Sequence, residues 1–518
     1  MCRKWRHIVF ASPQGLRLRL YCTHGTPVLK SLDCWPALPI VVECGGSLTL
    51  APPAPEVEDN IMAALKHTHR VISINLTVTG SLMEKIGTIV EPFWELEDLV
   101  LLSQNSAQLV LPGTFQCGSR LRSLHLTRVA FSALPQRLSF SPNLIDLQLH
   151  EIPSVGYFSP EAFVDALSGM TRLQSLSLHF LSLPCRSNHI GMSPPSGRRV
   201  VLLALTRLKF RGSSNYLDSL VARIDAPCLG DLEIRFFNQL TYDVSQLGRF
   251  IDRIETQRSY HRADVLTSKR AVSISFTQQG APTRLSLEIS CGQSDWQLSC
   301  MAQICNRFPA SLLGVGDIGI NTTRPSSGKD DVDCEQWLEL IRSFRRAKRF
   351  FVAGKLATDI VRALRSADGE PVTVLPALQD LYVQEPVPLY VPVREVMAPF
   401  IICRRLCGRP VRVKYLCSIC KTSFSRQQKL RGHIKHEHES QRQRDVCPFT
   451  WSSRGADICQ RHLCQQHAHG VQLLIRSRHL RTHVSGNSGT LGIPAASAKN
   501  NEFILALPNF KLRNLHGL

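Results

Sequence analysis

The six-residue run LRSLHL at residues 121–126 is the element on which the predicted fold depends. It places apolar side chains at Leu121, Leu124 and Leu126, in the pattern apolar-x-x-apolar-x-apolar. Six more copies surround it, at Val71-Ile74-Leu76, Leu96-Leu99-Leu101, Leu144-Leu147-Leu149, Leu173-Leu176-Leu178, Leu205-Leu208-Phe210 and Leu229-Leu232-Ile234. The seven copies start 25, 25, 23, 29, 32 and 24 residues apart, which indicates an internal repeat.

Each copy predicts one short strand in which alternate apolar side chains point inward. One repeat cannot bury its own apolar face, so neighbouring repeats must stack. Leucine-rich repeats recur about every 20–29 residues, and the spacing therefore predicts an α/β, leucine-rich-repeat-like solenoid with inserted loops. Weaker copies at Val315-Ile318-Ile320 and Leu378-Leu381-Val383 extend it. Helical periodicity at residues 159–172 and 243–255 predicts its outer layer, and a generic α/β domain is the alternative.

Composition is that of a folded protein with an excess of positive charge. The 518 residues are 43% hydrophobic and 20% charged, with a net charge of +20. No run reaches the roughly 18 apolar residues of a membrane span, and the first residues lack the apolar centre of a secretory signal. We therefore expect an intracellular protein, nuclear or cytoplasmic, that has no membrane partner. Its 18 Cys are expected to be thiols or metal ligands rather than disulfides.

The positive charge is concentrated near the C-terminus. Residues 403–483 hold 17 Lys or Arg against 4 Asp or Glu, together with seven of the 18 Cys. This change in composition marks a boundary near residue 400. The segment is either a solvated basic tail or a module that binds a polyanion, and charge alone does not decide between them.

The strongest chemical motif lies within this basic segment. Cys417 and Cys420 are separated by two residues, twelve residues follow before His433, and four more separate His433 from His438. The spacing C-x2-C-x12-H-x4-H resembles C2H2 zinc fingers, including the apolar positions Tyr415, Phe424 and Leu430. His436 competes for the fourth position, but its spacing from His433 is shorter than usual.

This ligand set predicts a closed, structural Zn2+ site. Two thiolates beside a hairpin turn and two imidazoles on one side of a helix fill a tetrahedron and leave no open position for catalysis. A unit of this size has too small a core to fold alone, and Zn2+ binding contributes about 10–16 kcal/mol in finger peptides. We therefore predict a ββα finger that holds Zn2+ through Cys417, Cys420, His433 and His438.

The same finger suggests nucleic-acid binding as an alternative function. The resemblance implies base-facing positions at Arg426, Gln428 and Lys429, and Arg or Lys can pair with guanine edges. One finger reads about 3 bp, which gives little sequence specificity. A degenerate second finger is predicted at residues 441–483, where Thr450 replaces the second Cys of a knuckle that begins at Cys447.

The start of the chain resembles a second family. The run Cys2-Arg3-x-Trp5-Arg6-x-Ile8 is similar to the last helix of an F-box, and the following residues resemble fungal F-box proteins with leucine-rich repeats over roughly residues 1–260. The resemblance implies docking on the Skp adaptor of a cullin–RING ubiquitin ligase. The first two F-box helices are absent, so the F-box is truncated, and Trp5 is interpreted here as a core aromatic that caps the first repeat.

These observations predict an interaction protein. No motif of a nucleotide-binding loop, zinc protease or serine hydrolase occurs, so we expect no enzymatic activity. A protein partner is expected on the repeats, as in a ubiquitin-ligase substrate receptor, or DNA or RNA on the finger. The predicted parts are an F-box remnant and cap at 1–50, the repeat array at 51–395, a basic linker at 396–412, the C2H2 finger at 413–440, the degenerate finger at 441–483 and a flexible tail at 484–518.

Overall fold

A computed structural model of the chain divides it into two compact units, Met1–Ser440 and Gln441–Leu518. The structure describes only residues of the first unit. These residues are 16–34, 38–44, 54–103, 109–115, 119–131, 141–182, 199–239, 241–255, 260–278, 284–290, 297–308, 312–323, 334–366, 374–384, 393–417, 422–424, 429 and 433.

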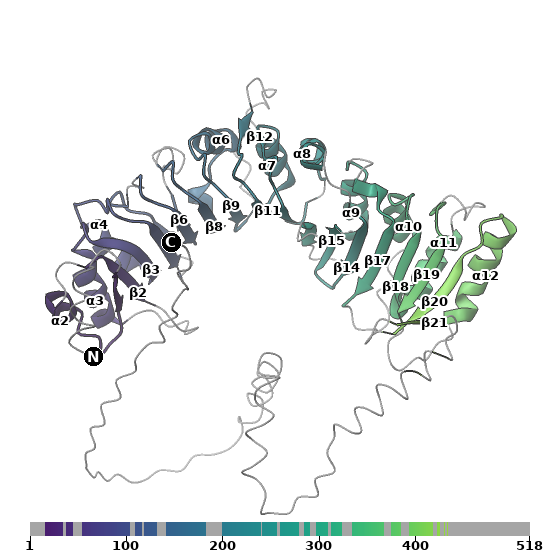
Figure 1. The fold of residues 1–518 in the computed structure, drawn as a ribbon, viewed down its shortest axis with the longest axis horizontal. Helices are drawn as coiled ribbons and strands as arrows, with labels where there is room; N and C mark the ends of the chain where they lie inside the picture. The colour runs from purple at the N-terminus through teal and green to yellow at the C-terminus, as the bar shows by residue number, and fades with distance from the viewer. Residues whose placement is uncertain are drawn as a thin grey trace, which may run out of the picture. The chain divides into compact units, whose positions relative to one another are not determined.

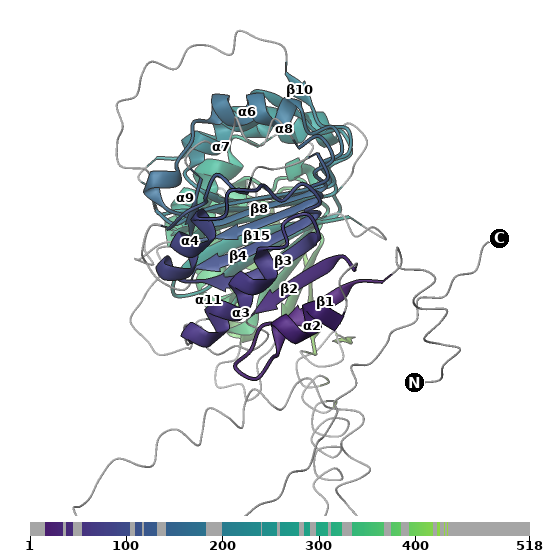
Figure 2. The ribbon, with the colours of Figure 1, turned by 90° about the vertical axis from the view of Figure 1, so that its left-hand side faces the viewer.

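Most of the described strands belong to one sheet of seventeen strands. Its first nine strands follow chain order, and every neighbouring pair is parallel. They are β1 (Leu18–Tyr21), β2 (Ile40–Cys44), β3 (Val71–Val78), β4 (Asp98–Ser103), β6 (Ser123–Thr127), β8 (Asp146–Ile152), β9 (Ser175–Phe180), β11 (Arg207–Gly212) and β13 (Asp231–Phe236). Figure 2 shows the first of them lying side by side.

Chain order is reversed in the middle of the sheet. Beside β13 lies β16 (Arg284–Ser290), then β15 (Ala271–Thr277), then β14 (Arg262–Thr267). The strand β15 is antiparallel to both of its neighbours, whereas β16 is parallel to β13 and β14 is parallel to β17 (Asp317–Thr322). A three-stranded antiparallel insertion therefore joins two blocks of parallel strands.

After the insertion the strands follow chain order again. The second block continues with β18 (Arg349–Ala353), β19 (Asp380–Gln384) and β20 (Arg412–Leu416), all parallel, and ends with the short antiparallel strand β21 (Ser423–Phe424). Two short pairs lie outside this sheet, namely β5 (Leu109–Val110) with β7 (Val129–Ala130) and β10 (Val200–Val201) with β12 (Ile224–Asp225).

The helices cover one face of the sheet (Figure 1). They are α2 (Val28–Cys34), α3 (Pro55–Leu65), α4 (Gly80–Gly87), α6 (Pro160–Ser168), α7 (Ser214–Val221), α8 (Ser245–Glu255), α9 (Gln297–Cys305), α10 (Cys334–Arg342), α11 (Gly354–Ser366) and α12 (Val393–Leu406), with 3-10 turns η2 (Ser154–Gly156) and η4 (Leu312–Gly314). Among the described residues no helix packs on the other face, which we call the open face.

Local sequence explains where several of these helices begin. Ser159 caps α6 by accepting a hydrogen bond from the Ala162 amide, and Pro160 occupies the first turn. Helix α8 is capped by the preceding repeat, because the Asp218 carboxylate accepts from the amides of Gln246 and Leu247 at 2.8 and 2.9 Å. Both caps satisfy free amide groups at a helix start, and the Asp218 cap also ties one repeat to the next.

The predicted repeat fold is confirmed in its coarse form, an α/β solenoid-like scaffold. All the apolar side chains that define the nine predicted copies are at most 5% exposed. In the first seven copies the second and third apolar residues lie in the strand, and the first lies just before it in every copy except Val71, which begins β3. The helices expected at 159–172 and 243–255 are also confirmed, as α6 and α8.

The domain boundaries remain predictions, and several of them fall outside the described residues. Residues 396–412, predicted as a linker, include most of α12 and the first residue of β20. The F-box remnant at residues 2–8 and the segments 441–483 and 484–518 lie outside the described part of the chain. No described helix is long and apolar enough to cross a membrane.

Candidate functional site

The strand register places side chains of successive repeats in rows across the open face. The central row holds the residue between the two buried apolar positions of each strand. In the first block these residues are Asn75, Val100, His125, Gln148, Ser177, Lys209 and Glu233. Neighbours in a row are about 4.8 Å apart, so residues distant in sequence can contact one partner together.

A histidine cluster occupies the first block of the open face, on β6, β8 and β9. His125 Nε2 lies 2.7 Å from Asp146 Oδ2. The Ser177 hydroxyl lies between two other rings, 3.0 Å from His150 Nε2 and 3.4 Å from His179 Nε2. These two rings stack with centroids 4.3 Å apart and planes 8° apart. Because one hydroxyl serves both rings, the arrangement suits two neutral imidazoles, one donating and one accepting.

Burial is the main reason why two of these histidines resist protonation. It lowers the pKa of His150, with a further contribution from the positive charge of His125. It also lowers the pKa of His179 to about 4, assisted by His150, Arg211 and Arg235. The carboxyl of Asp146 differs, because burial raises its pKa but hydrogen bonds, chiefly from His125 and Gln148, outweigh this effect and leave the pKa lowered.

Acidification should therefore destabilise the array through the stacked pair. Below about pH 6.5 His150 and His179 bind protons in the unfolded chain but not in the folded chain. The free energy of unfolding therefore decreases as the pH falls toward 4. We expect His179→Gln to remove roughly 1 kcal/mol of the stability change between pH 7 and 5, after allowance for solvent screening. Urea unfolding at several pH values measures this difference, with the exposed His69→Gln as control. A His179→Gln profile parallel to that of the wild type would contradict the expectation.

The backbone beside this cluster has an uncommon conformation. Arg128 and Glu151 directly follow Thr127 and His150, which face each other in β6 and β8, and have φ values of 58° and 51°. Their side chains form an ion pair, and the Arg128 amide donates to the His150 carbonyl at 2.9 Å. Non-glycine residues seldom adopt positive φ, and such positions often accompany functional sites. The strain therefore marks this part of the open face as a candidate binding region.

A second group of side chains, the aromatic row, occupies the C-terminal block of the open face. Phe351 and Tyr382 stack with centroids 4.5 Å apart. The Arg262 guanidinium lies 4.8 Å from the centre of the Phe351 ring, and Lys414 Nζ lies 5.0 Å from that of Tyr382. Gly319 leaves room for this arrangement, since a Cβ there would lie 2.2 Å from the Asp264 carboxylate that holds Arg262. Cations thus cover both outer ring faces, which favours contacts through ring edges and charged groups.

The predicted finger begins as part of the sheet. In β20 and β21, Tyr415 faces Phe424, and beyond this pair the Cys417 amide donates to the Thr422 carbonyl at 3.0 Å. Cys417 is buried, and the His433 ring lies against Phe424 with centroids 4.9 Å apart. The first predicted thiolate therefore follows β20 directly, and the first predicted imidazole lies against Phe424 of β21.

The remaining predicted site residues are only partly described. Cys420, His438, Arg426 and Gln428 lie outside the described residues, and Lys429 is exposed. In the described part of the chain, no three His, Cys, Asp or Glu residues gather in a way that could hold a metal. Only two of the four predicted ligands lie in this part of the chain, so the zinc site stays a prediction. The buried thiol beside a hairpin turn and the imidazole held by an aromatic ring fit the donor set of a structural Zn2+ site.

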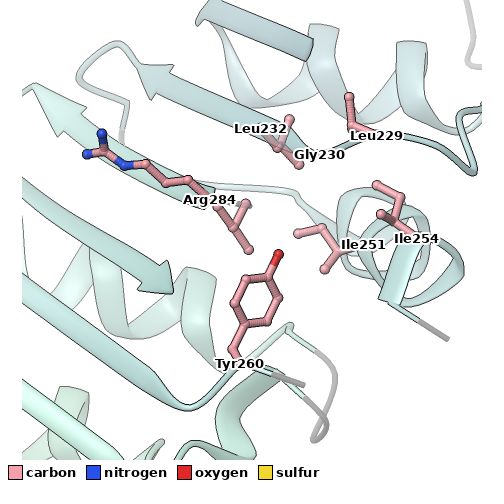
Figure 3. A pocket seen from close by; sticks show the side chains of 8 residues that line it. Leu229, Gly230, Leu232, Ile251, Ile254, Tyr260 and Arg284 are labelled. Carbon is pink, nitrogen blue, oxygen red and sulfur yellow. The ribbon is translucent and has the colours of Figure 1, made fainter. Parts of the chain in front are cut away.

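One pocket occurs beside the insertion, at the junction of β13, β16 and α8. Its walls are Leu229, Gly230, Leu232, Ile251, Ile254, Tyr260, Arg284 and Leu285. Figure 3 shows the Tyr260 ring directed toward Ile251, while the Arg284 guanidinium points away. The cavity measures about 10 Å³, which is the room of one water molecule. It is therefore too small for a substrate or cofactor.

Comparison with known proteins adds little to these observations. No protein-family model and no curated protein matches the chain. Among solved structures it is similar to the leucine-rich repeat-containing protein LegL7 from Legionella pneumophila, with 11% identity and a TM-score of 0.26 over 76% of this chain and 98% of that chain. The structural class is therefore defined by the strand register and the single helix layer. The described fold is a leucine-rich-repeat-like array, and this architecture usually serves as an interaction scaffold.

The two groups on the open face were not predicted from the sequence. Their residues occupy the variable positions of the repeat pattern, and pattern analysis assigns those positions only to the surface. A signal was present nevertheless, since His125, His150 and His179 lie in three consecutive copies, at or near corresponding positions. Aligning the copies by their apolar residues would have shown this enrichment.

Proposed function

We propose that this protein is a non-enzymatic, zinc-binding interaction scaffold. The open face of the array binds a protein partner, and a C2H2 finger at the end of the same sheet holds one Zn2+ through Cys417, Cys420, His433 and His438. The observation that carries the first part is the row arrangement of polar and aromatic side chains on a face that no described helix covers. Such surfaces allow several repeats to contribute to one contact.

Comparative affinity purification tests the partner-binding part. We expect the double variant Arg207→Ala and Arg235→Ala, which truncates two exposed open-face side chains, to weaken retention of the specific partner about tenfold or more. The matched control is Arg249→Ala with Arg342→Ala, two exposed arginines on the helix face. Quantitative mass spectrometry of the retained proteins should then show losses confined to the open-face variant. Equal retention by both variants would reject the open face as the binding surface.

Elemental analysis tests the metal part. The purified full chain is expected to contain about one Zn2+, and Cys417→Ser is expected to abolish stoichiometric loading because thiolate ligands dominate the affinity of such sites. The control is Cys407→Ser, which changes an exposed thiol ten residues earlier. Wild-type protein without stoichiometric metal, or unchanged metal in the Cys417→Ser variant, would refute the zinc site.

Two more specific forms of the proposal rest on the sequence. In one, the N-terminal resemblance makes the array a substrate receptor of a ubiquitin ligase, tested by co-purification with the Skp adaptor after a complete F-box is fused to the N-terminus of the chain. In the alternative, the basic finger region binds nucleic acid through Arg426, Gln428 and Lys429. Affinity for duplex DNA that falls steeply with salt supports this alternative, and no affinity at low salt excludes it.

A further inference from the structure

We propose that the zinc-bound finger is the C-terminal cap of the repeat array, so that metal binding sets the order of the last strands of the open face. This inference rests on the proposed zinc site and gives that site a role in regulating the interaction surface. It follows from the position of one strand, β20, which belongs to both parts.

Strand β20 pairs on both of its edges. On one edge it is parallel to β19 over five residue pairs, from Asp380 facing Arg412 to Gln384 facing Leu416. On the other edge it is antiparallel to β21, which the finger contributes. The ligand Cys417 follows β20 directly, with no residue between the last repeat strand and the metal-binding turn. The first strand of the predicted finger is therefore also a strand of the array.

The apolar core is continuous through this junction. Val411, Tyr415 and Cys417 belong to the same buried cluster as Val383 of β19 and Phe400 of α12. Tyr415 is 4% exposed and Cys417 is fully buried. Phe424 packs against this cluster and also contacts the His433 ring. The side chains that would surround the metal are therefore also the ones that close the end of the core.

The end of a repeat array needs such a closure. A terminal repeat has no neighbour to bury its apolar side, and an unpaired edge strand invites association with other chains. In the described residues only β21 pairs with the outer edge of β20, and it does so over two residues. A two-residue strand contributes too little to hold this closure alone. Metal binding at the adjoining turn would supply the missing free energy.

Through β20 the cap reaches the aromatic row on the open face. Lys414 Nζ lies 3.1 Å from the Tyr382 hydroxyl, and the Arg412 guanidinium donates to the Asp380 carboxylate at 2.8 and 3.1 Å. Tyr382 in turn stacks on Phe351. If β20 loosens, Lys414 is lost from the row and one face of the Tyr382 ring is uncovered. Metal loss at the finger would thus alter the surface two strands away.

Hydrogen exchange of the full chain, with and without a zinc chelator, tests this coupling. We expect chelation to speed exchange of the β19 amides at residues 380–384 at least tenfold, with a smaller effect on β18, and to leave β8 and β9 unchanged. Adding Zn2+ back should restore protection. The variant Cys417→Ser should behave like the chelated protein, and Cys407→Ser like the wild type.

Metal content measured on the same samples distinguishes failure of the proposed zinc site from failure of the proposed cap. If the untreated protein contains one Zn2+ and protection of residues 380–384 is the same before and after chelation, the cap is refuted and the zinc site stands. If the untreated protein contains no Zn2+, the zinc site is refuted and the cap with it. If chelation speeds exchange equally in β8 and in β19, the metal stabilises the whole array rather than its end, which also refutes the cap.

Discussion

Replacing Phe276 with alanine is expected to destabilise the array by about 3–5 kcal/mol and to divide its unfolding into two steps. Phe276 lies in β15, the strand that runs against the direction of the rest of the array, and its side chain is fully buried. The Tyr260 ring contacts it edge-on, with centroids 5.9 Å apart. Truncation leaves a cavity between this strand and the helix layer, which β15 and its neighbours cannot fill without losing their register.

The division into two steps follows from the strand order. In the described sheet, the first parallel block reaches the second only through the two antiparallel pairings of β15, with β16 and with β14. Stability in repeat arrays is approximately a sum of local terms, so a weakened junction uncouples the blocks on either side. The two blocks should then unfold at different denaturant concentrations.

Urea unfolding followed by circular dichroism, together with calorimetry, measures this effect. The matched control is Leu266→Ala in the adjacent strand β14, where the side chain is 40% exposed on the open face. This change should stay within about 0.5 kcal/mol of the wild type. A single cooperative transition in Phe276→Ala, with a loss below about 1 kcal/mol, would show that β15 does not hold the blocks together.

The sequence predicted the repeats that begin with an apolar residue of the expected kind and missed the others. Strands β14, β18 and β20 have the same apolar spacing in the structure. Their patterns begin with Tyr260, Ala347 and Pro410 instead of leucine or valine. Such residues are common in loops and strands alike, so a pattern in one sequence cannot show whether they begin a repeat or lie in a loop. Burial in the assembled core shows that Tyr260 and Ala347 serve as Leu does elsewhere.

The reversed strand order could not be predicted in this way. Local periodicity reports which residues point inward, but it does not report which strand lies beside which. The alternation in residues 271–277 and 284–290 is typical of strands, but it is the same whichever strands are their neighbours. The contacts of the open face depend on that order, because the aromatic row joins residues 262, 351, 382 and 414. The metal motif differs, since its spacing is local and is visible in the sequence itself.

The second large effect concerns Gly248, where helix propensity and packing predict opposite signs. Within an exposed helix, replacing glycine with alanine should stabilise by about 1 kcal/mol. In α8, however, a Cβ at residue 248 would lie 2.6 Å from the carbonyl oxygen of Arg307, in the segment that follows α9. That segment is held by hydrogen bonds from the amides of Arg307 and Phe308 to the end of α9, and Phe308 is buried.

Because the obstacle is backbone rather than a mobile side chain, α8 must move away from it. We expect Gly248→Ala to destabilise by about 1–3 kcal/mol, the usual cost of overpacking a core. Gly87→Ala is the matched control, since Gly87 ends helix α4, is exposed and has nothing within 4 Å of an added Cβ. It should be neutral or stabilising by up to about 1 kcal/mol. Calorimetric midpoints of the two variants should therefore move in opposite directions, and a Gly248→Ala protein as stable as Gly87→Ala would mean that the two helices do not approach this closely.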